Sequence, residues 1–104
     1  MCNPASATAA TATATLQAEN EFAIVTRWDF APGQATGWHR HGHPYVVVPV
    51  TDGVLRIVSA GGVETLVPLT AGSSYARPEG VEHDVFNGGD APLSFVEVEI
   101  KRRA

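Results

Sequence analysis

Two short segments of this sequence, each opening on a glycine, hold three of its four histidines. Residues 33–41 contain His39 and His41, and residues 72–87 contain His83. In an extended strand, residues two apart point to the same face, so His39 and His41 present two imidazoles side by side. A third imidazole from another strand completes a half-shell of nitrogen ligands. This pattern is typical of a metal site.

The rest of the chain, from Glu21 onward, has the pattern of short β-strands separated by Gly, Pro and Asp. Residues 22–30 alternate in a period of two, with a heavy aromatic face on one side. Further strands are expected at residues 45–50, 54–59, 63–69, 74–77, 83–87 and 93–100. Their even spacing predicts an all-β barrel or sandwich, and no segment predicts a helix.

Two details bear on how these strands connect. Asp52-Gly53 is a strong signal for a two-residue hairpin, which would join the strand before it to the strand after it. Pro49 lies inside a strand-like run, and because proline cannot donate a ladder hydrogen bond, we expect an edge position or a bulge there.

The two histidine segments resemble the two conserved motifs of the cupin superfamily. The first motif reads Gly, five residues, His-x-His, three or four residues, Glu, six residues, Gly; the matching positions are Gly33, His39, His41 and Gly53. The second reads Gly, five residues, Pro-x-Gly, two residues, His, three residues, Asn; the matching positions are Gly72, Pro78, Gly80, His83 and Asn87. The resemblance covers residues 22–100. It implies an all-β, single-domain cupin fold, a jelly-roll-like barrel also called a double-stranded β-helix, with a metal at its centre.

The chain departs from the first motif at the glutamate, whose place is taken by Val46 or by Tyr45 according to the spacing used. We expect Val46 to form an apolar wall there. Three neutral imidazoles leave a divalent cation with its full charge, which favours anionic bidentate ligands such as enolates and dicarbonyls. In this respect the chain resembles the three-histidine cupins, which include iron-dependent β-diketone-cleaving and thiol dioxygenases.

Four other residues are candidates for the site. Tyr45 and Arg77 suit the orientation of an anionic substrate, although strand tyrosines more often pack and arginines more often lie at the surface. Glu97 is a candidate general base or substitute carboxylate, with a solvated surface role as the alternative. His43 extends the alternation of histidines but precedes Pro44; we expect it to support the metal ligands from outside, with direct ligation as a fourth ligand as the alternative.

Length and composition limit the number of domains, the partners and the cellular location expected for the protein. A length of 104 residues suits one domain, and a net charge of −4 argues against nucleic-acid and anionic-membrane partners. The lone cysteine, Cys2, excludes an intramolecular disulfide, and no apolar run approaches the roughly 18 residues of a membrane span. With no signal-peptide pattern, the expected location is the cytoplasm.

The first part of the chain, residues 1–20, differs from the rest because it is rich in Ala and Thr and poor in large apolar groups. Such a composition is typical of a disordered tail. Residues 11–16, however, alternate β-branched with small residues, as an edge strand does. We therefore expect an N-terminal arm that pairs with the barrel domain of residues 21–104 or with a second subunit, and a homodimer, because a small domain gains from burying more surface.

Together these observations predict a metal-binding protein, and most specifically a small dioxygenase that uses Fe²⁺ to oxidise a chelating dicarbonyl or small organic acid. Imidazole also suits Zn²⁺, Ni²⁺, Mn²⁺ and Cu²⁺, so the metal is left open. Two other functions remain: a non-catalytic module that binds a metal or small ligand, and a metal-assisted isomerase or lyase.

Overall fold

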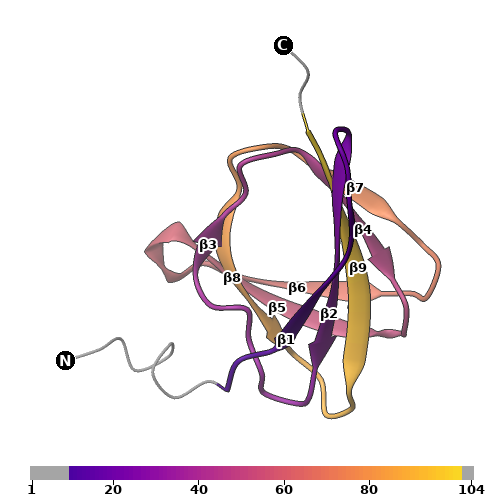
Figure 1. Ribbon diagram of the computed structural model, residues 1–104. Coiled ribbons are helices and arrows are strands. Elements are labelled where there is room, and N and C mark those ends of the chain that lie inside the picture. Colours follow the sequence, from indigo (N-terminus) through magenta and orange to yellow (C-terminus); the bar gives the residue numbers. More distant parts are fainter. Residues whose placement is uncertain (1–9, 102–104) are drawn as a thin grey trace.

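The computed structural model describes residues 10–101, and within this range nine β-strands form two facing sheets (Figure 1). The five-stranded sheet has the order β1 (Thr13–Glu19), β2 (Ala23–Phe30), β9 (Leu93–Ile100), β4 (Tyr45–Pro49) and β7 (Tyr75–Arg77). The four-stranded sheet has the order β3 (His39–Arg40), β8 (Glu82–Asn87), β5 (Gly53–Ser59) and β6 (Glu64–Leu69). All neighbouring strands in these sheets are antiparallel.

The all-β prediction is confirmed. The one helical element between residues 10 and 101 is a single 3₁₀ turn, Ala60–Gly62, and no helix in this range is long and apolar enough to cross a membrane. The two sheets pack face to face as a jelly roll and are not closed into a continuous barrel.

The expected strands are confirmed to within about a residue at each end, but the predicted hairpin at Asp52-Gly53 is wrong. β4 and β5, on either side of it, belong to different sheets, and both edges of β4 are already paired, with β9 and β7. The Asp52 carboxylate instead accepts a hydrogen bond from the Ala71 amide at 2.9 Å. Gly53 is needed for close packing, since a Cβ atom there would lie 3.2 Å from the Leu93 side chain.

Pro49 is the last residue of β4. The pairing of β4 with β7 covers only residues 45–47, so the ladder on that side has ended before the proline. The Pro49 carbonyl still accepts a hydrogen bond from the Gly72 amide at 2.9 Å. The residue thus occupies a strand end, where its missing amide hydrogen costs no ladder bond on the β7 side.

The core lies between the sheets and is built by alternate residues of the strands. Its largest fully buried side chains are Phe30, Leu55, Leu93 and Phe95, from both sheets. The rings of Phe30 and Phe95 are 5.5 Å apart between centroids. Burying each side chain of this size contributes about 1.5–3 kcal/mol, and Leu55 is the residue of the four that brings the four-stranded sheet into this core.

The N-terminal segment is anchored to the domain at its first described residues. Ala12 is buried, and it pairs with Ala35 through a 2.9 Å backbone hydrogen bond. β1 then runs antiparallel to β2, which confirms the expected edge strand, and every residue of β1 is exposed. The division into an arm of residues 1–20 and a domain of residues 21–104 stays a prediction, and residues 1–9 lie outside the described range.

Candidate metal centre

The two histidine segments are brought together by the pairing of β3 with β8. His39 and His83 are direct partners across this ladder, so their side chains leave the sheet on the same face. His41 follows directly after β3, where its amide donates to the Val81 carbonyl at 2.9 Å and its carbonyl accepts from the Gly80 amide at 2.8 Å. Gly80 has a φ of 93°, in the left-handed region that favours glycine. The second motif's glycine therefore helps to hold the second histidine of the first motif in place.

The three imidazoles converge through their Nε2 atoms. The His39 and His41 Nε2 atoms are 2.9 Å apart, and those of His41 and His83 are 3.2 Å apart. Two ligands at right angles around one ion, each about 2.1 Å from it, are about 3.0 Å apart, whereas tetrahedral ligands are about 3.4 Å apart. The two distances lie in the range expected of ligands around one ion, and three protein ligands leave further positions for water or a substrate.

The tautomer of His39 is set by the backbone. Its Nδ1–H donates to the Gly37 carbonyl at 2.8 Å, which leaves the Nε2 lone pair for a metal. Gly37 itself has a φ of 88°, and its amide donates to the buried Asp84 carboxylate at 3.1 Å. Sequence reasoning missed Gly37 and Asp84. The glycine two residues before His39 was the available signal for a special backbone conformation.

Burial also keeps the other two histidines neutral. His41 and His83 are 5% and 4% exposed, and burial lowers the pKa of His41 to about 4 and that of His83 to about 3. Their neighbouring imidazoles and the Arg77 guanidinium add to both pKa shifts. Because a metal binds the unprotonated ring, this donor set fits a divalent transition metal.

Tyr45 occupies the place that the family motif gives to a glutamate. Its side chain is buried, and its ring stacks on that of His41 at 3.8 Å between centroids. Burial, reinforced by the charge of Glu97, raises the pKa of Tyr45 to about 12, so the hydroxyl keeps its proton. The expectation that Val46 forms a wall there is wrong, because the buried residues of β4 are Tyr45, Val47 and Pro49, and Val46 lies on the opposite face of the strand.

Glu97, on β9, places a carboxylate beside the histidines. Among residues 10–101 it is the one acidic residue with a carboxylate oxygen within 4.0 Å of a histidine ring nitrogen. Its Oε2 atom lies 4.0 Å from the His41 Nε2 atom. Burial and the charge of Glu99 raise the pKa of Glu97 to about 7, partly offset by a hydrogen bond from Trp28. A carboxyl group with this pKa can accept or release a proton near neutrality.

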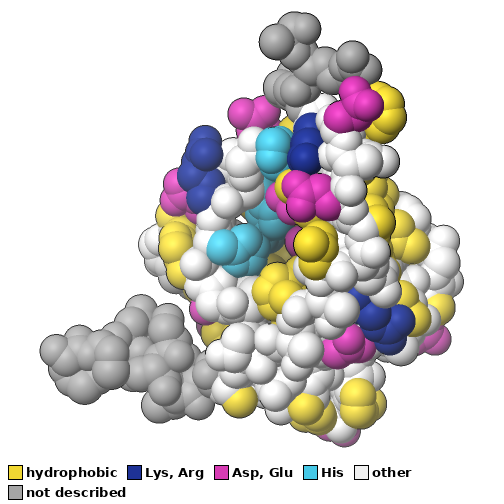
Figure 2. Space-filling view, viewed as in Figure 1, with side chains coloured by type: hydrophobic (Ala, Val, Ile, Leu, Met, Phe, Trp, Pro, Cys, Tyr) yellow, Lys and Arg dark blue, Asp and Glu magenta, His cyan; other side chains and the backbone are white. Residues whose placement is uncertain are grey.

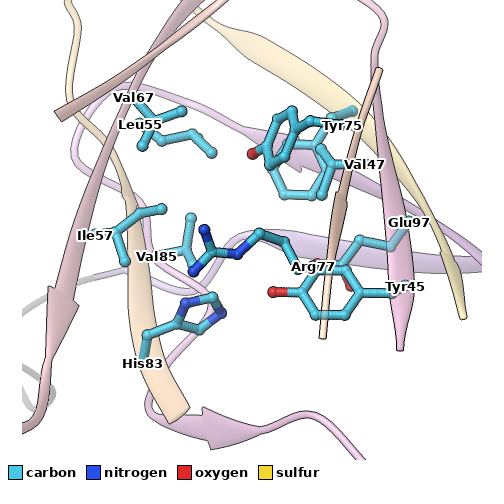
Figure 3. Close-up of a pocket in the computed structure, with 11 residues that line it drawn as sticks. Tyr45, Val47, Leu55, Ile57, Val67, Tyr75, Arg77, His83, Val85 and Glu97 are labelled. Atoms are coloured by element: carbon cyan, nitrogen blue, oxygen red, sulfur yellow. The ribbon is translucent and has the colours of Figure 1, made fainter. Parts of the chain in front are cut away.

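Two cavities meet at Glu97. The outer cavity, of about 220 Å³, is lined by residues from both sheets that include Trp28, His39, His41, Glu97 and Glu99. Figure 2 shows histidine side chains in a hollow of this face. The inner cavity, of about 140 Å³, lies between the sheets, and Glu97 and His83 are among the residues that line it (Figure 3).

The remaining sequence candidates fall in different places. Arg77, on β7, lines the inner cavity, and its guanidinium points toward the middle of that space (Figure 3). His43 is half-buried in the segment between β3 and β4, and the group of ring nitrogens that faces a common point consists of His39, His41 and His83. The roles expected for Tyr45, Arg77, Glu97 and His43 stay predictions.

Comparison with known proteins gives the same family and fold. The family described as "Cupin domain" matches residues 26–99. A solved structure of a cupin domain from Bordetella pertussis Tohama I has a TM-score of 0.86 at 50% identity, and the match covers 90% of this chain and 97% of that one. An RmlC-like cupin family protein with a double-stranded β-helix fold, from Methanocaldococcus jannaschii, has a TM-score of 0.72 at 14% identity over 89% of this chain and 83% of that one.

A similar curated protein is the beta-alanine degradation protein BauB of Pseudomonas aeruginosa. It is 53% identical over 87 residues, which make up 84% of this chain and 90% of the relative.

Proposed function

The chain belongs to the cupin family, and from that premise we propose that it is a metal-dependent dioxygenase acting on a chelating dicarbonyl or small organic acid. The observation that carries the proposal is the convergence of ring nitrogens of His39, His41 and His83, which lie within 4.8 Å of one another. Fe²⁺ is the metal we propose, with Zn²⁺, Ni²⁺, Mn²⁺ and Cu²⁺ as alternatives that the same imidazoles would hold.

When bound, the metal would supply Lewis acidity and, as iron, redox chemistry toward O₂. The residues of the chain have separate tasks around it. Arg77 pairs with the negative charge of the substrate, and the Tyr45 hydroxyl, which keeps its proton, donates a hydrogen bond to a substrate oxygen. Glu97 takes a proton from the substrate, a role suited to a pKa of about 7. The buried walls of the inner cavity exclude bulk water from the reacting groups.

A second function, a metal-assisted isomerase or lyase, is favoured by the same property of Glu97. An isomerase needs a general base that titrates near neutrality beside a polarised carbonyl group, and it needs no O₂. The name of the Pseudomonas relative concerns beta-alanine degradation and is compatible with both chemistries.

The cellular setting is part of the same proposal. We place the protein in the cytoplasm, since its single cysteine excludes an intramolecular disulfide. We propose a homodimer, with a small molecule and neither nucleic acid nor membrane as its ligand. The fully exposed strand β1 supports the dimer, because a second copy could cover it.

The test is metal analysis of untagged protein, followed by O₂ uptake of the iron-loaded form with a panel of dicarbonyls and small acids. We expect uptake with at least one compound, and loss of both metal and uptake in H41A. The matched comparison is H43A, which removes an imidazole outside the ring-nitrogen cluster and should lose less metal than H41A, as expected of a residue that supports the ligands from outside.

Other outcomes distinguish the remaining functions. Metal binding without O₂ uptake, but with solvent deuterium entering a substrate C–H position, would favour the isomerase or lyase. Metal binding with neither reaction would favour the non-catalytic module. If H41A and H43A lose metal equally, the assignment of the ligands is wrong.

A further inference from the structure

Arg77 differs from the other cations of the described chain in having no carboxylate partner. Each of the other arginines and the lysine between residues 10 and 101 is paired: Arg27 with Asp29, Arg40 with Glu82, Arg56 with Glu64 and Lys101 with Glu19. Within the same range, no carboxylate lies within 4 Å of the Arg77 guanidinium. Its side chain keeps an exposed surface, so a solute can reach it.

The guanidinium lies at the polar end of the inner cavity. Figure 3 shows it crossing the cavity from β7, with the His83 ring on one side and the Tyr45 hydroxyl nearby. The other end of the cavity is apolar. It is walled mainly by Val47, Leu55, Ile57, Val67, Val85 and Phe95. A ligand with one negative charge at one end and an aliphatic chain at the other matches this division.

The volume of the cavity limits the size of that ligand. The inner cavity measures about 140 Å³. An apolar cavity of about 150 Å³ holds benzene, a molecule of six carbon atoms. A ligand of about six or seven non-hydrogen atoms therefore fills the space. After the three atoms of a carboxylate, three or four atoms remain for the chain.

The charge of the ligand is limited as well. A carboxylate can form two parallel hydrogen bonds with a guanidinium, which is the strongest recognition that Arg77 can provide. A second carboxylate at the far end would be buried against valine and leucine side chains, where the Tyr75 hydroxyl could donate one hydrogen bond but the described lining residues include no cation other than Arg77 to balance the charge, which is unfavourable. The apolar end therefore selects against dicarboxylates.

We propose that the inner cavity is a subsite for a short aliphatic monocarboxylic acid, whose carboxylate pairs with Arg77 beside His83 and whose chain lies against the apolar walls. The proposal deepens the function proposed above, since it narrows the substrate to one class of small organic acid. It rests on that function only in placing the metal next to the carboxylate.

The test is isothermal titration calorimetry of the full chain, metal-free and zinc-loaded, with acetate, propanoate, butanoate, pentanoate, hexanoate and octanoate. We expect affinity to rise by about fourfold for each added methylene until the cavity is full, near pentanoate, because each buried methylene adds about the same transfer free energy. Affinity should then fall for octanoate. Butanamide and butanedioate should both bind at least about tenfold more weakly than butanoate.

Variants test the role of the guanidinium. R77Q should weaken butanoate binding by about ten- to a hundredfold, as expected for losing a charge-assisted hydrogen-bonded pair, and R77K should recover part of the loss. The matched control is R27Q, which removes a guanidinium that is already paired with Asp29 outside both cavities and should leave binding unchanged. Thermal midpoint and zinc content, measured on each variant, should match those of the unaltered protein.

Equal binding of butanoate and butanamide, absence of any dependence on chain length, or unchanged binding in R77Q would each overturn the proposal. These results are separate from a failure of the proposed function. A protein that binds butanoate through Arg77 but takes up no metal would keep this subsite and lose the dioxygenase assignment. A protein that binds metal and consumes O₂ with other substrates, but binds none of the monocarboxylates, would keep the dioxygenase assignment and lose this subsite.

Discussion

At the scale of single residues, the site contains two kinds of shifted pKa that act on stability in opposite directions. Folding lowers the pKa of His41 and His83 from the ordinary 6.5, so below pH 6.5 these two residues bind protons in the unfolded chain and not in the folded chain. The folded protein raises the pKa of Glu97 from the ordinary 4.5 to about 7, so between these values the folded chain holds a proton that the unfolded chain has lost. The histidines therefore destabilise the fold in acid, and Glu97 destabilises it as the pH rises.

The first pH prediction concerns the metal-free protein. Between about pH 4.5 and 6.5 the unfolded chain binds protons at His41 and His83 that the folded chain does not bind, whereas the folded chain holds one proton at Glu97 that the unfolded chain has lost. The unfolded chain therefore binds up to about one more proton than the folded chain. Stability should therefore rise with pH in this window, by at most about 1.4 kcal/mol per pH unit. Above pH 6.5 only Glu97 contributes, so stability should fall slightly until pH passes about 7. Urea unfolding midpoints from pH 4.5 to 8 measure both slopes.

The variant E97Q separates the two contributions. Without the glutamate, the rise of stability between pH 4.5 and 6.5 should become steeper, and the fall above pH 6.5 should disappear. A pH profile identical to that of the unaltered protein would show that the carboxyl group of Glu97 titrates normally.

At the scale of the strand, β4 shows that a motif with variable spacing does not decide which residue takes the position of the glutamate. The family motif allows three or four residues between the second histidine and the glutamate, and this choice decides which face of the strand the position occupies. The structure places Tyr45 inward and Val46 outward. The sequence alone could not decide between them, because both are apolar enough to be buried.

The inward position of Tyr45 leads to a prediction about metal affinity. Y45E should place a carboxylate beside His41, where the tyrosine ring now lies 3.8 Å away, and should tighten divalent-metal binding by roughly tenfold or more. By lowering the charge of the site, it should also reduce any oxygenase activity toward chelating anions. Competition with a chromophoric chelator measures the affinity.

The matched variant is V46E, which carries the same new charge on the opposite face of β4 and should leave metal affinity unchanged. If V46E tightens binding and Y45E does not, the face assigned to each residue is reversed.

The strands themselves were predictable because each alternates in a period of two and ends at Gly, Pro or Asp. The clustering of His39, His41 and His83 was predictable because their spacing matches two motifs. The connection at Asp52-Gly53 was not, since a turn signal reports local chain reversal and says nothing about which sheet the next strand joins. The inner cavity could not be predicted from the sequence, because it depends on the distance between the two sheets, which is set by side chains packed between them such as Leu55 and Phe95.

At the scale of the whole molecule, the N-terminal segment is expected to contribute to both stability and association. Deleting residues 1–19 removes β1 and the buried Ala12. The thermal midpoint should fall, by about 4–8 °C for each kcal/mol lost in a domain of this size. Light scattering should show weaker self-association. Metal content should stay unchanged, because the three histidines lie on other segments.

The control is the double substitution L16T together with F22T, which replaces two exposed apolar side chains and keeps the β1–β2 pairing. It should weaken association with a smaller change in midpoint. A full-length protein that is monomeric, and that melts at the same temperature as the truncated one, would contradict the prediction.

The two sheets divide the chemistry between them. Every proposed metal ligand comes from β3, β8 or the segment beside them, whereas Tyr45, Arg77 and Glu97 come from β4, β7 and β9 of the opposite sheet. The metal half and the acid half of the site thus come from different sheets and meet at two direct contacts, the Tyr45 ring stacked on His41 and the Glu97 carboxylate 4.0 Å from the His41 Nε2 atom. Residues away from these two contacts, such as Arg77, can change while the three histidines persist, so a lineage of such proteins could change its substrate and keep its metal.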